Sequence, residues 1–265
     1  MSYAMTRVGI HRNIHLKKTR LNPVFALFLA ALLASFSAFP VSPQVRVVTE
    51  QWPPYNYLDE HGNVTGIATN KVEQVLTNLN LDANIEVFHW AKAMQLAEFE
   101  KNVFIYSIYR TPDREARFQW ICPLLEKRSI ALYRLAERVD IDINQVQDAK
   151  NYRTSVIRND LSMDMLVKAG FMEGEHYELS IDEETNVRKL IHGRIDLIIQ
   201  EEHALRFRLA ELGIDFSHVV RVQSLGNEEK YDCCIATSLQ TDKALVEQVR
   251  SELYSLYKVK AAQAN

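Results

Sequence analysis

Two short segments combine residue types that could bind a small charged molecule. The first, Trp52–Tyr57 (WPPYNY), places three aromatic side chains on a loop that two prolines hold extended. Such aromatics can form one wall of a ligand cleft, or they can cover a hydrophobic core. The second, Tyr106–Arg114 (YSIYRTPDR), is rich in hydroxyls and carries Arg110 and Arg114. A guanidinium binds a carboxylate through paired hydrogen bonds, so this segment either holds an anion or carries two solvated arginines.

Motifs of common catalytic chemistry are missing from the sequence. It contains no phosphate-binding loop, no dinucleotide-binding glycine pattern, no GxSxG turn and no HExxH motif. Its histidines are scattered, and no His/Cys cluster has the spacing of metal ligands. We therefore assign no catalytic residue, no metal and no cofactor, and we expect a binding protein rather than an enzyme.

The segments that must position these residues alternate between strand and helix patterns. Val45–Thr49 has the β-branched character of a strand, and apolar residues at helical spacing follow it. The alternation restarts after residue 150, which favours an α/β fold with two lobes, each a mostly parallel sheet flanked by helices. Short strand segments near 122–128 and 224–232 are expected to join the lobes. The expected helices cover residues 68–79, 91–99, 161–169, 184–192, 202–212 and 245–256.

The first forty residues differ in kind from the rest. Residues 1–20 hold five basic and no acidic side chains, and the uncharged apolar run Leu21–Phe36 and small residues follow. This order predicts a secretory signal peptide over residues 1–38, with a retained membrane anchor as the alternative. Its removal takes five of the 31 basic residues and none of the 34 acidic ones, leaving 26 against 34 and a net charge of −8. We expect an acidic periplasmic protein, and no basic excess argues for nucleic acid.

Three cysteines remain in the exported chain, and an odd number allows at most one internal bridge. Cys233 and Cys234 are adjacent and bridge each other only with a strained backbone. Two alternatives stay open: a bridge from Cys122 to one of them, or three buried thiols.

Seven short motifs occur in an order that resembles the extracellular solute-binding proteins of family 3, the polar-amino-acid-binding type. The resemblance extends over nearly all of the exported chain, about residues 44–257. The motifs are Glu50–Tyr55 (EQWPPY), Gly62–Gly66 (GNVTG), Trp90–Ala93 (WAKA), Ser107–Arg114 (SIYRTPDR), Phe118–Pro123 (FQWICP), Gly193–Asp196 (GRID) and Asp232–Ala236 (DCCIA). The resemblance implies a type II periplasmic binding protein fold hinged by two connecting strands. Lobe 1 would comprise residues 44–125 plus 228–265, and lobe 2 residues 126–227.

The resemblance also implies a set of ligand-binding residues. The family's carboxylate-binding arginine falls on Arg114, and its ligand-contacting serine falls on Ser107. The aromatic that packs on the ligand falls on Trp52, with Trp90 facing it. The acid that takes the ligand's ammonium falls on Glu201. An arginine at one end and a carboxylate at the other suit a zwitterion, because each buried charge needs a partner.

Three residues in two segments depart from the family pattern. Tyr109 stands where a second small hydroxyl is expected, and the first turn of lobe 2 has Asp160 and Leu161 in place of a glycine and small hydroxyls. We include Asp160 among the ligand-binding residues, although an aspartate there would repel a carboxylate. The ligand could therefore be an amino acid or a cationic, aromatic, dipeptide or other small polar solute.

Membership of this family implies a monomeric periplasmic protein that passes a small molecule to an inner-membrane ABC permease. One alternative is a ligand-binding sensor module without transport, although the sequence ends at Asn265 without a kinase domain. Another is a dehydratase-like enzyme on the same fold, with Glu50 or Glu201 as the general acid.

Overall fold

A computed structural model describes residues 44–225 and 231–263 of the chain. The predicted signal peptide, residues 1–38, lies outside the described residues, as does part of the second predicted connection, at 226–230. None of the helices in the described ranges is long and apolar enough to cross a membrane.

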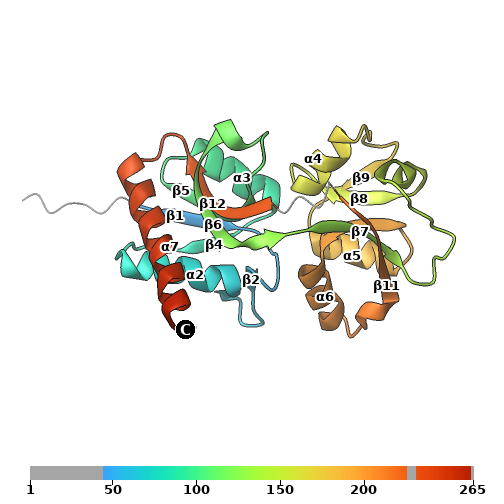
Figure 1. Ribbon diagram of the computed structural model, residues 1–265, viewed down its shortest axis with the longest axis horizontal. Coiled ribbons are helices and arrows are strands. Elements are labelled where there is room, and N and C mark those ends of the chain that lie inside the picture. Colours follow the sequence, from blue (N-terminus) through green and yellow to red (C-terminus); the bar gives the residue numbers. More distant parts are fainter. Residues whose placement is uncertain (1–43, 226–230, 264–265) are drawn as a thin grey trace, which may run out of the picture. The chain divides into compact units, whose positions relative to one another are not determined.

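The first sheet, which we assign to lobe 1, has the strand order β4-β1-β5-β12-β6 (Figure 1). Its strands are β1 (Arg46–Thr49), β4 (Ile85–Val87), β5 (Val103–Tyr109), β6 (Phe118–Arg128) and β12 (Tyr231–Ser238). β1 pairs in parallel with β4 and β5, and β12 is antiparallel to β5 and β6. The helices of this lobe are α2 (Ile67–Asn78), α3 (Trp90–Phe99) and α7 (Lys243–Gln263), and α2 packs against α7.

The second sheet, which we assign to lobe 2, has the order β11-β7-β10-β8-β9. Its strands are β7 (Ile130–Leu135), β8 (Thr154–Ile157), β9 (Tyr177–Ser180), β10 (Leu197–Glu201) and β11 (Val219–Ser224). β8 pairs in parallel with β9 and β10, whereas β7 is antiparallel to β10 and β11. The helices are α4 (Leu161–Lys168), α5 (Glu183–Ile191) and α6 (Glu202–Glu211). In each sheet one strand, β12 or β7, runs against the other four, so the predicted mostly parallel sheets are confirmed.

Several short elements complete the chain. They are the hairpin β2 (Tyr57–Leu58) and β3 (Val64–Thr65) and the 3₁₀ turns η1 (Glu115–Arg117), η2 (Val146–Asn151) and η3 (Phe216–His218). The helix α2 begins after Gly66, whose φ of 123° brings it so close to the Tyr55 carbonyl that an added Cβ would lie 2.4 Å from its oxygen. Only glycine fits this position, and it fixes the Trp52–Tyr57 loop against the start of α2.

A disulfide joins two neighbouring strands of the first sheet. Cys122 on β6 is bonded to Cys234 on β12, and the two Cα atoms are 4.6 Å apart. Cys233 is a free, fully buried thiol. The alternative of three thiols is therefore wrong, and the alternative of a bridge from Cys122 to one of the adjacent pair is confirmed. The side chains of Cys233 and Cys234 point to opposite faces of β12, as successive strand residues do, and only Cys234 lies on the face that carries Cys122.

Candidate functional site

A bulge in β5 presents Ser107 at the edge of lobe 1. Cys234 of β12 lies opposite Ile108 and Ile235 lies opposite Tyr106, so Ser107 is the extra residue between two regular pairs. Its φ of 63° is in the left-handed region, which is uncommon for a residue with a side chain. The Ser107 hydroxyl donates to Asn56 Oδ1 at 2.5 Å. Bulges of this kind re-aim side chains beside functional sites.

A small inner cavity lies next to this bulge and receives side chains from both lobes. Its volume is about 20 Å³, room for one water-sized group. Five of the six predicted site residues line it: Trp52, Trp90, Ser107, Asp160 and Glu201. Glu50, Tyr109, Ile130, Ser162, Glu183, Ile199 and Gln200 complete the wall.

The aromatic wall of the inner cavity is also part of the hydrophobic core. The Trp52 ring lies 4.3 Å from the ring of Tyr55 and meets Tyr109 edge-on at 5.7 Å. The Trp52–Tyr57 loop therefore covers the core, as one of its two interpretations predicted, and Trp52 and Tyr109 also line the cavity. The interpretation of this wall as part of a ligand site stays a prediction.

Arg114 does not line the inner cavity. Its guanidinium instead joins the two lobes: Nη2 donates to the Asn159 carbonyl at 2.8 Å and pairs with Asp164 Oδ2 at 3.1 Å. The Arg114 group also lies over the Trp90 ring, 5.4 Å from its centroid. Only 1% of Arg114 is exposed, so it is not a solvated arginine. Arg110 is exposed and pairs with Glu115, as expected for a solvated side chain.

The Asn159 carbonyl accepts two hydrogen bonds from side chains of lobe 1. Trp90 Nε1 donates to the Asn159 oxygen at 2.7 Å, alongside Arg114. Asn159 has a φ of 61°, and asparagine tolerates this left-handed conformation better than most residues do. The conformation of the turn before α4 therefore presents this carbonyl to the donors of lobe 1.

Glu201 is held by both lobes. Its Oε2 accepts from Tyr55 Oη in lobe 1 and from the Ala204 amide at the start of α6, each at 3.0 Å. Its Oε1 lies 2.8 Å from His203 Nδ1. Glu201 therefore caps a helix and contacts the other lobe, in addition to lining the cavity.

Two carboxyl groups of the cavity have strongly raised pKa values. Burial raises the pKa of Glu50 well above its ordinary value, and the neighbouring Glu183 and Asp160 carboxylates raise it further. Burial raises the pKa of Glu183 to about 7, although Arg208 Nη2 lies 3.0 Å from its Oε2 and opposes the shift. Among the described residues the Glu50 carboxylate has no hydrogen-bond partner. Because several acidic groups lie close together with few cations to balance them, a positively charged group would be stabilised in this cavity.

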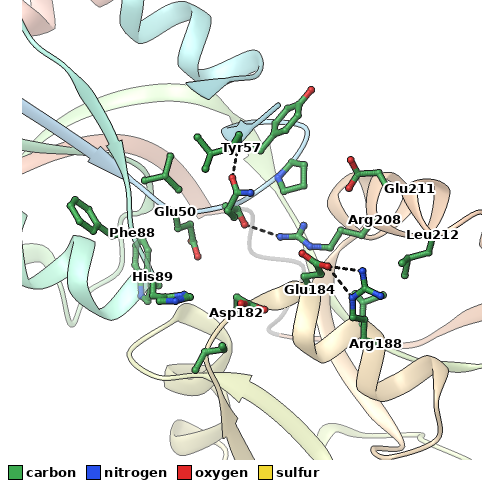
Figure 2. Close-up of a pocket in the computed structure, with 17 residues that line it drawn as sticks. Glu50, Tyr57, Phe88, His89, Asp182, Glu184, Arg188, Arg208, Glu211 and Leu212 are labelled. Atoms are coloured by element: carbon green, nitrogen blue, oxygen red, sulfur yellow. Dashed lines mark hydrogen bonds and ion pairs between the residues drawn. The ribbon is translucent and has the colours of Figure 1, made fainter. Parts of the chain in front are cut away.

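A larger outer groove of about 440 Å³ shares Glu50 and Trp90 with the inner cavity. Figure 2 shows Glu50 from lobe 1 and Asp182 from lobe 2 on its two sides. Arg208 donates to the Gln51 carbonyl at 2.8 Å, and Arg188 pairs with Glu184. Other lining residues include Tyr57, Leu58, Phe88, His89 and Glu211.

Sequence reasoning did not select Tyr109, Glu183 and Gln200 as site residues. Gln200 directly precedes Glu201 at the carboxyl end of β10, where ligand-binding residues of such sheets gather, so its position could have identified it. Glu183 starts α5 after a strand that the sequence pattern did not reveal. No group of His, Cys, Asp and Glu in the described ranges could hold a metal ion.

Two lobes with mixed sheets and a cavity lined from both define a type II periplasmic binding protein fold, as predicted. The chain belongs to the bacterial extracellular solute-binding proteins, family 3, whose family model matches residues 45–260. No curated protein matches the sequence.

Three solved structures illustrate how widely this fold is used. A histidine kinase sensor domain with similarity to periplasmic binding proteins has a TM-score of 0.72 at 14% identity, covering 84% of this chain and 93% of its own. An ancestral arginine-binding protein bound to arginine has a TM-score of 0.69 at 17% identity, covering 81% and 92%. A putative L-cystine ABC transporter protein from Listeria monocytogenes has a TM-score of 0.67 at 18% identity, covering 80% and 89%. At these identities the likeness describes the fold alone.

Proposed function

We propose that this protein captures a small polar solute, an amino acid or a related compound, in the cleft between its lobes. The observation that carries the proposal is the inner cavity, which gathers five residues selected from the sequence although they come from separate segments of both lobes. A cavity of about 20 Å³ is too small for a whole amino acid, so the lobes separate to admit a ligand. Contacts with both lobes then give the closed form its higher affinity for the ligand.

The proposed roles follow the chemistry of each side chain. Trp52 and Trp90 form the apolar walls, Ser107 offers a hydroxyl, and Asp160 and Glu201 offer carboxylate oxygens. Arg114 contributes by holding the lobes together through Asp164. A role for Arg114 in binding a ligand carboxylate stays a prediction, and it requires Asp164 to release the guanidinium.

Transport is the proposed use of this binding. The family supports delivery of the solute to an inner-membrane ABC permease by a periplasmic monomer. The purified protein would be titrated by calorimetry with a panel of amino acids, amines and dipeptides. Small-angle scattering would measure its radius of gyration with and without each solute. Binding with compaction supports the proposal, and the absence of both for every solute contradicts it. Stimulation of a reconstituted permease by the loaded protein tests the transport step separately.

A sensor role is the second candidate, favoured by the similarity to a histidine kinase sensor domain. In that case the loaded protein would bind a receptor and would leave the ATPase rate of the permease unchanged. The same reconstitution therefore separates the two functions.

A further inference from the structure

The inner cavity has more carboxyl groups than there are cationic side chains to balance them. Four carboxyl groups line it: Glu50, Asp160, Glu183 and Glu201. Among the described residues, Arg208 is the only arginine paired with one of them, Glu183, and His203 contacts Glu201 from the solvent side. No lysine or arginine lines the cavity itself.

Two polar groups in the same wall lack any partner. Gln200 is 2% exposed, and its Oε1 accepts no hydrogen bond. Tyr109 is 7% exposed, and its hydroxyl is likewise unpaired. A buried acceptor without a donor destabilises the empty protein, and a ligand with N–H donors would satisfy it. These atoms indicate a ligand independently of the carboxylates.

Two kinds of group that could receive a ligand carboxylate, the Arg114 guanidinium and the helix N-termini of lobe 2, are already occupied by the protein. Arg114 is held by Asp164 and by the Asn159 carbonyl. The N-termini of three lobe 2 helices, which favour anions, are each capped by an acid of the chain. These caps are Asp160 for α4, Asp182 for α5 and Glu201 for α6. A carboxylate in the inner cavity would therefore meet four acidic side chains, and the unpaired donors near it include the Tyr109 hydroxyl and Arg208 Nη1 of the outer groove.

Size indicates which cation fits. The inner cavity holds one water-sized group, and a primary ammonium is a compact charge with three donors. The outer groove adjoins it through Glu50 and Trp90 and has about 440 Å³ for the rest of a ligand. Its lining mixes apolar side chains such as Phe88 and Leu58 with further acids, Asp182, Glu184 and Glu211. Two arginines also line it: Arg188, which pairs with Glu184, and Arg208, which pairs with Glu183.

We propose that the inner cavity binds the primary ammonium group of an aliphatic amine that carries no carboxylate. The ammonium donates to Gln200 Oε1 and to the Glu50 and Asp160 carboxylates, and the carbon chain lies in the outer groove. The proposal rests on the proposed function, since it names the substrate class of that same cleft. It replaces the amino acid expected for the family with a diamine or a similar organic cation.

Matched pairs of ligands test the substrate class. Calorimetry with the purified protein would compare cadaverine with lysine and putrescine with ornithine, each pair differing only in the carboxylate. We expect each amine to bind more tightly than its amino acid by about tenfold or more. Lysine binding as tightly as cadaverine, or binding of glutamine or glutamate alone, overturns the amine proposal and leaves the solute-binding function standing. No binding by any of these compounds overturns the amine proposal, and the solute-binding function fails only if the whole panel of amino acids, amines and dipeptides also fails to bind.

Matched variants test the position of the ammonium. Glu50→Gln and Asp160→Asn each remove one charge, and asparagine caps a helix as well as aspartate does. Each should weaken cadaverine binding by about tenfold or more. Glu247→Gln is the control, because Glu247 on α7 is exposed, pairs with Arg250 and lines neither the inner cavity nor the outer groove. Equal affinities of all three variants and the unmodified protein would place the ammonium elsewhere and overturn the assignment.

Discussion

Arg114 and Asp164 form an ion pair across the two lobes, with Nη2 and Oδ2 3.1 Å apart. The arginine is almost fully buried, and the aspartate side chain is 24% exposed. The loop that follows β5 in lobe 1 and the helix α4 in lobe 2 are therefore tied by a charged contact that the protein supplies from its own residues.

Removing this arginine should destabilise the contact between the lobes. Arg114→Ala leaves the Asn159 carbonyl and the Asp164 carboxylate without their donor, at a cost of about 1–3 kcal/mol. Urea unfolding measures the loss. Arg114→Lys should restore only part of it, because an ammonium lacks the planar fork. Arg110→Ala is the control and should stay within about 0.5 kcal/mol, since its partner Glu115 is at the surface. Equal effects of both alanine variants would contradict this role.

The Tyr55–Glu201 hydrogen bond should contribute to the same closed arrangement. Tyr55→Phe removes the donor to Glu201 Oε2 and keeps the ring against Trp52, so we expect a loss of about 1 kcal/mol. The pair can be measured in a double-mutant cycle with Glu201→Gln, which retains an acceptor for the Ala204 amide. If the effects of the two substitutions on the unfolding free energy simply add, then the interaction free energy between Tyr55 and Glu201 is zero and the prediction is wrong.

Stability should fall as the pH rises from about 4.5 to about 7. The Glu183 carboxyl titrates at its ordinary pKa of 4.5 in the unfolded chain and at about 7 in the folded protein. The folded state therefore holds more protons in this window, so the free energy of unfolding decreases with pH, by up to about 3 kcal/mol for this group. Burial shifts the pKa of Glu50 in the same direction.

Glu50→Gln provides the test of that dependence. Urea unfolding at about pH 5 and about pH 8 should show a smaller difference in this variant, with higher stability at the upper pH. Glu184→Gln serves as the matched surface control. If the difference in unfolding free energy between the two pH values is the same in the Glu50 variant, then ionisation of Glu50 does not destabilise the folded protein.

Thiol chemistry should find one free cysteine per unfolded, unreduced chain and none in the native protein, because Cys233 is fully buried. Reduction of the Cys122–Cys234 bond should lower stability by about 2–5 kcal/mol. Cys233→Ser leaves the bond intact and should remove the one reactive thiol. Three thiols in the unreduced protein would rule out the bridge.

The sequence predicted the fold because its signals are local. Helical spacing of Val72 and Val75 predicts a helix, and a glycine such as Gly193 predicts where a helix ends, in both cases without reference to distant residues. The strands β7 and β9 were missed, because short runs within mixed sequence lack a clear period of two.

The site was harder to predict because its partners are distant in the chain. The resemblance selected residues that line the cavity, yet the geometry of Arg114 depends on Asp164 and on the Asn159 carbonyl in the other lobe. Burial of Glu50 beside Glu183 likewise follows from the tertiary structure. Neither relationship leaves a pattern in the local sequence.

The bond between Cys122 and Cys234 has a topological consequence. These residues are 112 positions apart, and the whole of the second sheet, with α4, α5 and α6, lies between them. Residues 122–234, which carry that sheet, are therefore a covalently closed ring that the sulfur–sulfur bond within lobe 1 completes. A single protease cut anywhere within that ring would open the backbone and add one water, but the two pieces would stay joined until the link is reduced.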